Sequence, residues 1–140
     1  MNKQALAEQV ARLIEPQDRA SRLLGMRLRE VRPGHALISM RVTQEMLNAQ
    51  DVCHGGMIFS LADSSFGYAG NSHNPRALAA SCSIEFLAPA HVGDELTAEA
   101  QETAHAGRTR IYSVRVTNQR NELVALFNGK SATVKGTWVE

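Results

Sequence analysis

The sequence predicts an α+β domain in which one antiparallel sheet packs against one long buried helix. Residues 55–71 are apolar or small around the whole circumference of a helix, and such a helix belongs in a core. Segments with a period of two lie on both sides of this helix, and those after it are separated only by short turns. Successive strands with short turns predict an antiparallel meander, so the elements form a helix layer on a sheet layer.

The composition describes one ordinary globular domain over residues 1–140, with 44% hydrophobic and 21% charged residues. The net charge of +1 gives no general attraction to nucleic acid or to an anionic membrane. The two cysteines fit no zinc spacing, and two isolated thiols are typical of a reducing compartment. The polar N-terminus also lacks the apolar core of a signal peptide, so we expect a cytoplasmic protein.

The N-terminal segment is predicted to be helical. Residues 3–14 form a short amphipathic helix that ends at Pro16, and residues 18–25 form a further turn of helix that stops at Gly25. Residues 26–42 then form two strands around a turn at Pro33 and Gly34, and residues 43–54 form a polar loop. In the second strand, Ala36, Ile38, Met40 and Val42 are expected to share one face, and Leu37, Ser39 and Arg41 the other.

Four strands are predicted after the buried helix. They fall within residues 76–89, 94–104, 109–118 and 123–135, with turns near Gly107 and at residues 119–122. In the third of these, Tyr112, Val114 and Val116 share a face. In the first, one face is expected to carry Leu78, Ala80, Cys82, Ile84 and Phe86, and the other Ala79, Ser81, Ser83 and Glu85.

Asp63 is the only residue with a full charge between His54 and Arg76. An unpaired buried carboxylate is costly, so Asp63 must be paired, reach a wet crevice or be partly protonated. Each of these suits a general base or nucleophile with a raised pKa. The alternative is a structural carboxylate that caps a group across the sheet.

Gly55 and Gly56 open the buried helix, where unpaired amides and the helix dipole favour a developing oxyanion. The alternative is a tight junction between loop and helix. Gly55 and Asp63 are eight residues apart, about 12 Å along one helix, so one helix cannot bring both to one carbonyl. Two antiparallel copies related by a two-fold axis can, which predicts an active dimer with sites across its interface.

Several polar residues precede this helix. His54 and Asn48 are candidates for contacts to a substrate, and hydrogen bonds that organise the loop are an equally good interpretation. A nucleophile made of Cys53 and His54 is disfavoured, because sequence neighbours seldom point at each other and no third orienting group is evident. No metal-binding spacing is present, and we expect no metal.

The segment from Asn48 to Asp63, with the HGG motif at residues 54–56, resembles the hotdog-fold acyl-CoA thioesterases, and the match extends to "SCSIEFLAP" at residues 81–89. The phenylacetate-pathway (PaaI-type) branch is the most similar, over about residues 20–136. The resemblance implies a hotdog fold, with an antiparallel sheet of five to six strands wrapped around a long central helix. It also implies an enzyme that hydrolyses an acyl-CoA, such as a phenylacetyl- or hydroxyphenylacetyl-CoA, to a carboxylate and free CoA, without a cofactor.

The resemblance implies a role for each matching residue. Asp63 would activate the hydrolytic water or attack directly, and the backbone N–H of Gly55 would bind the thioester oxygen. Asn48 would support the carbonyl and the loop, His54 would assist near the leaving thiolate, and Ser81 would position the water beside Asp63. Family members usually assemble as dimers of dimers, so a homotetramer is expected.

The CoA and the acyl group are implied by the resemblance, and candidate residues to bind them are chosen by their chemistry. Arg108, Thr109 and Arg110 form a local basic cluster in a turn that suits phosphates, and Lys130 is a further candidate for the CoA phosphates. A solvated turn is the alternative. The acyl pocket is predicted to be lined by residues of the loop and the helix, namely Met46, Leu47, Met57 and Phe66.

Two other functions stay open. One is an acyl-CoA hydratase or dehydratase on the same fold, although the helix offers Asp63 no companion His for that chemistry. The other is a non-catalytic acyl-CoA-binding module. Regulators of that type carry a DNA-binding helix-turn-helix, and the residues before the first strand are too few to form one.

Overall fold

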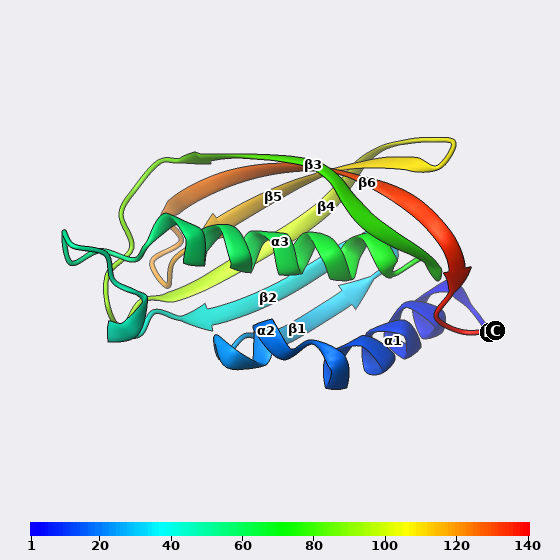
Figure 1. Ribbon diagram of the computed structural model, residues 1–140, viewed down its shortest axis with the longest axis horizontal. Coiled ribbons are helices and arrows are strands. Elements are labelled where there is room, and N and C mark those ends of the chain that lie inside the picture. The colour runs from blue at the N-terminus through cyan, green and yellow to red at the C-terminus, as the bar shows by residue number, and fades with distance from the viewer.

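The computed structural model describes all residues 1–140 and contains three α-helices and six β-strands (Figure 1). Short 3₁₀ turns follow the first helix, at Glu15–Gln17, and precede the long helix, at Gln44–Met46. The elements are α1 (Lys3–Ile14), α2 (Arg19–Leu23), β1 (Arg27–Arg32), β2 (His35–Arg41), α3 (Gly55–Asn71), β3 (Pro75–Phe86), β4 (Glu95–Ala106), β5 (Thr109–Thr117) and β6 (Leu123–Thr137).

The N-terminal helices form where the sequence places their signals. Asn2 caps α1, because its side chain accepts a hydrogen bond from the Ala5 N–H. Asp18 caps α2 in the same way, and Gly25 adopts a positive φ of 68° just after that helix. The predicted helix over residues 3–14 is therefore confirmed, and the turn over 18–25 contains the short helix α2.

All six strands form one antiparallel sheet in the order β1-β2-β4-β5-β6-β3. The predicted meander holds for β4, β5 and β6, but it is wrong for β3, which pairs with β6 at the edge of the sheet. The reason is the connection through α3, which carries the chain across the sheet and leaves β4 to pair with β2. β3 consequently has hydrogen-bonded neighbours on one side only.

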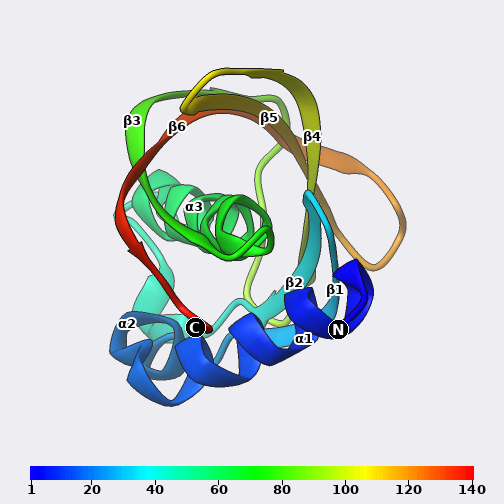
Figure 2. The same cartoon turned by 90° about the vertical axis from the view of Figure 1, so that its right-hand side faces the viewer.

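The sheet curls around α3, and α1 and α2 cover the side of the helix that the sheet leaves free (Figure 2). The inward faces of the strands bury apolar residues against α3, as predicted for Tyr112, Val114 and Val116. Phe66 of α3 stacks edge-on against Tyr112 and lies against Phe127. Gly129 of β6 makes this approach possible, because a Cβ there would lie 2.9 Å from the Phe66 ring.

The face assignment predicted for β3 is only partly correct. The pairing of β3 with β6 shifts register between Ala79 and Ser81, and this bulge breaks the period of two. Cys82 and Ile84 are half-buried as expected, whereas Leu78 on the other side of the bulge is 65% exposed. None of the helices combines the length and the apolar composition that a membrane span requires.

Candidate active site

Asp63 lies near the middle of α3 and is half-buried. It forms no ion pair and no hydrogen bond within the chain, so the structural alternative of a capped group across the sheet finds no partner. Burial raises the pKa of the Asp63 carboxyl above its ordinary value of 3.8, because the ionised form loses solvation. The carboxylate is therefore available to an external group and is a stronger base than a solvated aspartate.

The start of α3 presents one free amide. His54 is the N-cap residue, and its Nδ1 accepts the Gly56 N–H at 3.0 Å. Because Nδ1 accepts, the neutral ring carries its proton on Nε2, which can donate outward. The Gly55 N–H has no acceptor in the chain, and it lies at the positive end of the helix dipole. This amide has the properties of an oxyanion donor.

Asn48 organises the loop before α3. Its Oδ1 accepts the N–H groups of Gln50 and Val52, at 2.9 and 3.4 Å. The loop is also tied down at its end, since the His54 N–H donates to the Met46 carbonyl at 2.7 Å. The loop-organising interpretation therefore describes these contacts within the chain. The Asn48 side-chain amide has no acceptor there and stays free to donate to another group.

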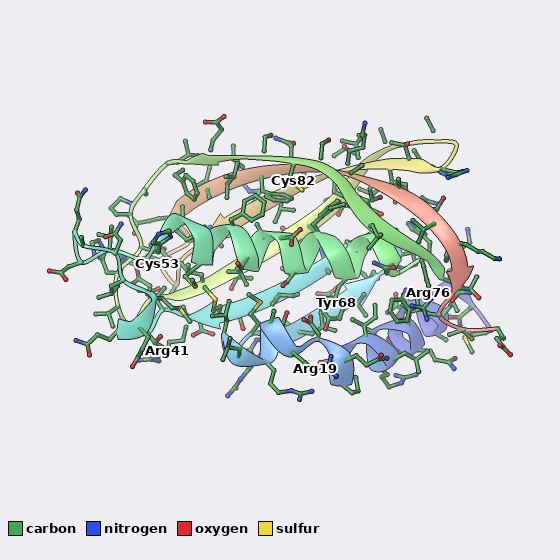
Figure 3. The ribbon with its side chains drawn as sticks, viewed as in Figure 1. Arg19, Arg41, Cys53, Tyr68, Arg76 and Cys82 are labelled. Atoms are coloured by element: carbon green, nitrogen blue, oxygen red, sulfur yellow. The ribbon has the colours of Figure 1, made fainter.

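Cys82, for which the sequence predicts no role, lies on β3 (Figure 3). It is close enough to Asp63 for the charge of that carboxylate to act on its thiol. Burial raises the pKa of the Cys82 thiol, and the charge of Asp63 raises it further. Ser81 instead sits at the bulge opposite Lys130 and is exposed. A signal was present in the sequence, because strand alternation placed Cys82 and Ser81 on opposite faces of β3. The water-positioning role of Ser81 remains a prediction.

Cys53 is buried, with 4% of its surface exposed, and it is one of the residues that line the cavity beside Gly55. Its Sγ contacts the carbonyl of His54 rather than the ring, and burial raises the pKa of the thiol to about 11. A thiol that stays protonated at neutral pH is a poor nucleophile. The side chains of His, Cys, Asp and Glu do not gather in any group of three that could hold a metal ion.

The basic candidates for CoA divide into two groups. Arg110 is engaged by Glu102, with contacts of 3.0 and 3.1 Å to its two carboxylate oxygens. Glu102 also accepts from Tyr112 and pairs with His73, so Arg110 belongs to a network at the C-terminal end of α3. The sequence missed this network, because its members are far apart in the chain. Arg108 and Lys130 are exposed and form no ion pair, and Thr109 is half-buried.

The four residues predicted for the acyl pocket differ in how deeply they are buried. Met46 and Phe66 are only 5% and 2% exposed and belong to the core, whereas Leu47 and Met57 are half-buried. Two apolar cavities lie near the site instead. One, of about 390 Å³, adjoins Gly55 and is lined by Val52, Ile58, Phe86 and Leu87 among others. The second, of about 280 Å³, adjoins α3 beyond Asp63.

Gly55 and Asp63 are eight residues apart on one straight run of α3, as the sequence predicts. Within one chain they are separated by about 12 Å along the helix axis. A single thioester carbonyl must lie within about 3 Å of an oxyanion donor while its attacking water touches the base. One chain alone therefore does not assemble this pair around one carbonyl.

Residues 50–125 match the family model described as the thioesterase superfamily. The chain is 42% identical over 131 residues to the acyl-coenzyme A thioesterase PaaI of Escherichia coli K12, with 94% of each chain covered. The structure of the E. coli PaaI protein from the phenylacetic acid degradation operon superposes with a TM-score of 0.95, at 40% identity over 97% of this chain and 99% of that one.

A Streptococcus mutans UA159 protein solved with acetyl-CoA bound is a more distant match. Its TM-score is 0.77 at 26% identity, covering 80% of this chain and 90% of the other. The sheet wrapped around one long helix is thus an arrangement this chain shares with proteins across a wide range of identity.

Proposed function

The chain belongs to the thioesterase superfamily, has its hotdog fold and is a thioester hydrolase of the acyl-CoA thioesterase kind, and from this premise we propose how its own residues carry out the reaction. Asp63 acts as the general base, and the Gly55 amide of the neighbouring subunit binds the carbonyl oxygen. The observation that carries this proposal is a half-buried carboxylate with a raised pKa and no partner in its own chain.

The active unit is a homodimer with two sites across its interface. Asp63 and Gly55 are too far apart on one helix to act on the same carbonyl. An antiparallel pair of α3 helices about a two-fold axis brings Asp63 of one subunit close to Gly55 of the other. The free edge of β3 supports such a contact, because a long edge strand with unpaired backbone groups is a template for pairing with another chain. A dimer of these dimers is the expected assembly.

Hydrolysis then proceeds by acyl transfer to water. Asp63 accepts a proton from the water, whose oxygen bonds to the carbonyl carbon, and the carbonyl oxygen gains negative charge beside the Gly55 amide. The intermediate collapses with loss of the sulfur, and the outward-facing Nε2–H of His54 donates a hydrogen bond to the leaving CoA thiolate. The proton that Asp63 took from the water is then passed to the sulfur, which restores the ionised base. Asn48 donates its free amide to the substrate carbonyl while its Oδ1 holds the loop, and Ser81 holds the water. Direct attack by Asp63 would give an anhydride instead, and label from ¹⁸O-water appearing in Asp63 after a single turnover identifies that route.

The substrate is an acyl-CoA with an aryl-acetyl group of the phenylacetyl- or hydroxyphenylacetyl-CoA type, in a catabolic role like that of the E. coli relative. Exposed cations without an ion pair suit the CoA phosphates best, which favours Arg108 and Lys130, with the Thr109 hydroxyl assisting. Arg110 is the weakest of the four candidates, because releasing it would leave Glu102 without its cationic partner. We place the enzyme in the cytoplasm, where acyl-CoA thioesters are handled and free thiols persist.

A thiol-release assay tests this function. The protein is incubated with a panel of acyl-CoA thioesters, and free CoA is followed with a thiol reagent. We expect turnover that falls by about 10²-fold or more in Asp63→Asn, while binding of a non-hydrolysable acyl-CoA analogue is retained. Asp51→Asn is the matched control, since it removes an exposed carboxylate of the loop.

Three outcomes contradict the proposal. Binding without CoA release from any thioester would support an acyl-CoA-binding module. Hydration of an enoyl-CoA would support the hydratase alternative. A monomeric mass by light scattering, with full activity, would exclude a site shared between subunits. Mixing Asp63→Asn with Gly55→Val subunits gives a sharper test, because a shared site predicts that hybrid dimers regain one intact site.

A further inference from the structure

The cavity of about 280 Å³ lies beside α3 from Ser64 to Asn71. Ser64 and Gly67 of α3 line one side of it, and the opposite walls come from Ile14, Leu78 and Trp138. Gly67 follows Asp63 by four residues, which is about 6 Å along the helix axis. Asp63 is not itself a lining residue, so an acyl group whose carbonyl reacts there has to extend about one helical turn to enter the cavity.

Gly67 keeps the cavity open. A Cβ at this position would meet no atom within 4 Å, so the space beside the helix is empty there. Glycine in the middle of a helix is less stable than alanine. The backbone at Gly67 does not require glycine, because its φ is not positive and no neighbour would clash with a Cβ there. The structural effect of Gly67 is therefore the open space beside the helix.

Trp138 forms a fixed wall of the cavity although it lies in the C-terminal tail. Its Nε1–H donates to Asn71 Oδ1 at 2.8 Å, and the Arg76 guanidinium stacks 3.9 Å from the ring centroid. The next residue is held as well, because Val139 exchanges two hydrogen bonds with the side chain of Asn74. The tail is thereby anchored, and the size of the cavity is defined by the structure.

Four polar side chains line the cavity, those of Asp18, Ser64, Tyr68 and Asn71, and each has a hydrogen-bond partner within the chain. The Tyr68 hydroxyl donates to Asp18 at 3.1 Å, and the Ser64 and Ser21 hydroxyl oxygens lie 3.0 Å apart. Figure 3 shows Tyr68 on the side of α3 that faces the N-terminal helices. The remaining surface is apolar, so the cavity suits an uncharged hydrocarbon group.

We propose that this cavity receives the acyl group of the substrate, and that Gly67 and Trp138 set the largest group accepted. The inference rests on the proposed function and assigns its acyl subsite. A dry apolar cavity of about 150 Å³ holds benzene, so a space of 280 Å³ accommodates one aromatic ring or a medium aliphatic chain. The core-buried Met46 and Phe66 have no role in this subsite, and the cavity beside Gly55 is its competitor.

Graded filling of the cavity tests this inference. Gly67→Ala, Gly67→Val and Gly67→Leu are compared by the ratio of kcat/KM for phenylacetyl-CoA to kcat/KM for acetyl-CoA. We expect the ratio to fall stepwise, by at least about 10-fold in Gly67→Leu, because a pocket discriminates by roughly 10–200-fold for one methylene. Trp138→Ala removes one wall of the cavity. The substrate preference of this variant should therefore shift towards acyl groups larger than phenylacetyl.

Ala88→Leu is the matched control, since it narrows the competing cavity beside Gly55. An unchanged ratio in Gly67→Leu and Trp138→Ala, with native circular dichroism and an unchanged mass, overturns the inference. So does a ratio that falls in Ala88→Leu and not in the Gly67 series. If Gly67→Leu does not fold, Gly67→Ala and Trp138→Ala decide the question. Failure of the wild type to hydrolyse any acyl-CoA would instead contradict the proposed function.

Discussion

The thiol of Cys82 on β3 lies beside the carboxylate of Asp63 on α3, close enough for the charge of Asp63 to raise the pKa of the thiol. Burial has the larger effect on Cys82, and burial also raises the pKa of Asp63 itself. The two groups therefore share a poorly solvated space between helix and sheet, in which negative charge is disfavoured. Several measurable consequences depend on this space.

The reactivity of Cys82 should report the charge of Asp63. Removing that charge in Asp63→Asn lowers the pKa of the thiol, so alkylation by iodoacetamide should begin at a lower pH than in the wild type. Mass spectrometry of the modified peptide against pH measures this. Cys53 serves as an internal reference, because it is buried and has a pKa of about 11. An identical pH dependence in both proteins would contradict the proximity of the two groups.

The pH dependence of hydrolysis should reflect the raised pKa of Asp63. A general base works only when it is ionised, so kcat/KM should fall on the acidic side with a midpoint above 3.8, the ordinary pKa of Asp. Cys82→Asp places a second carboxyl in the same space, and repulsion should move the midpoint higher still. Cys82→Ser is the uncharged control and should leave the midpoint near that of the wild type.

Asp63 should also reduce stability at neutral pH. A carboxyl with a raised folded-state pKa stabilises the fold fully only below its unfolded-state pKa, and this contribution is lost as pH rises through the folded-state pKa. Asp63→Asn should therefore raise the Tm at pH 7. The gain should shrink as the pH is lowered towards the ordinary range of Asp. Thermal unfolding followed by circular dichroism at several pH values measures both effects.

His54 should contribute to stability as an N-cap as well as to turnover. His54→Ala removes the acceptor of the Gly56 N–H and should cost about 0.5–2 kcal/mol. His54→Asn keeps a capping acceptor, so it should restore stability without restoring the ring N–H near the leaving group. Equal turnover in His54→Asn and wild type would show that capping is the only contribution of His54.

Gly129 should tolerate no side chain. Its Cβ would lie 2.9 Å from Phe66 and 3.0 Å from Phe127, two rings in the core. Gly129→Ala should therefore destabilise the protein by roughly 1–3 kcal/mol, the usual cost of overpacking. Gly67→Ala is the matched comparison, because it enters open space in a helix and should be neutral or stabilising. Urea unfolding of the two variants gives the comparison directly.

Local signals in the sequence were sufficient for the helices and for the chemistry of α3. The bounds of α3 follow from a polar loop, two glycines and an unbroken apolar run, and all of these lie within one segment. Asp63 stands out there because it is the only full charge. The pairing of β3 with β6 has no such signal, since it joins segments separated by two other strands. The bulge at Ala79–Ser81 likewise depends on the register in which β3 pairs with β6.

The sequence by itself determined a long apolar helix that begins at a free amide and carries one carboxylate, because period, composition and charge are local properties. Only the tertiary structure decided what surrounds that carboxylate. Packing placed Cys82 beside Asp63 and brought Arg110 into an ion pair with Glu102. It also left a cavity between Gly67 and Trp138, which are 71 positions apart in the chain. Solvation, ion pairing and empty space are set by which distant segments meet, and that is a property of the folded chain.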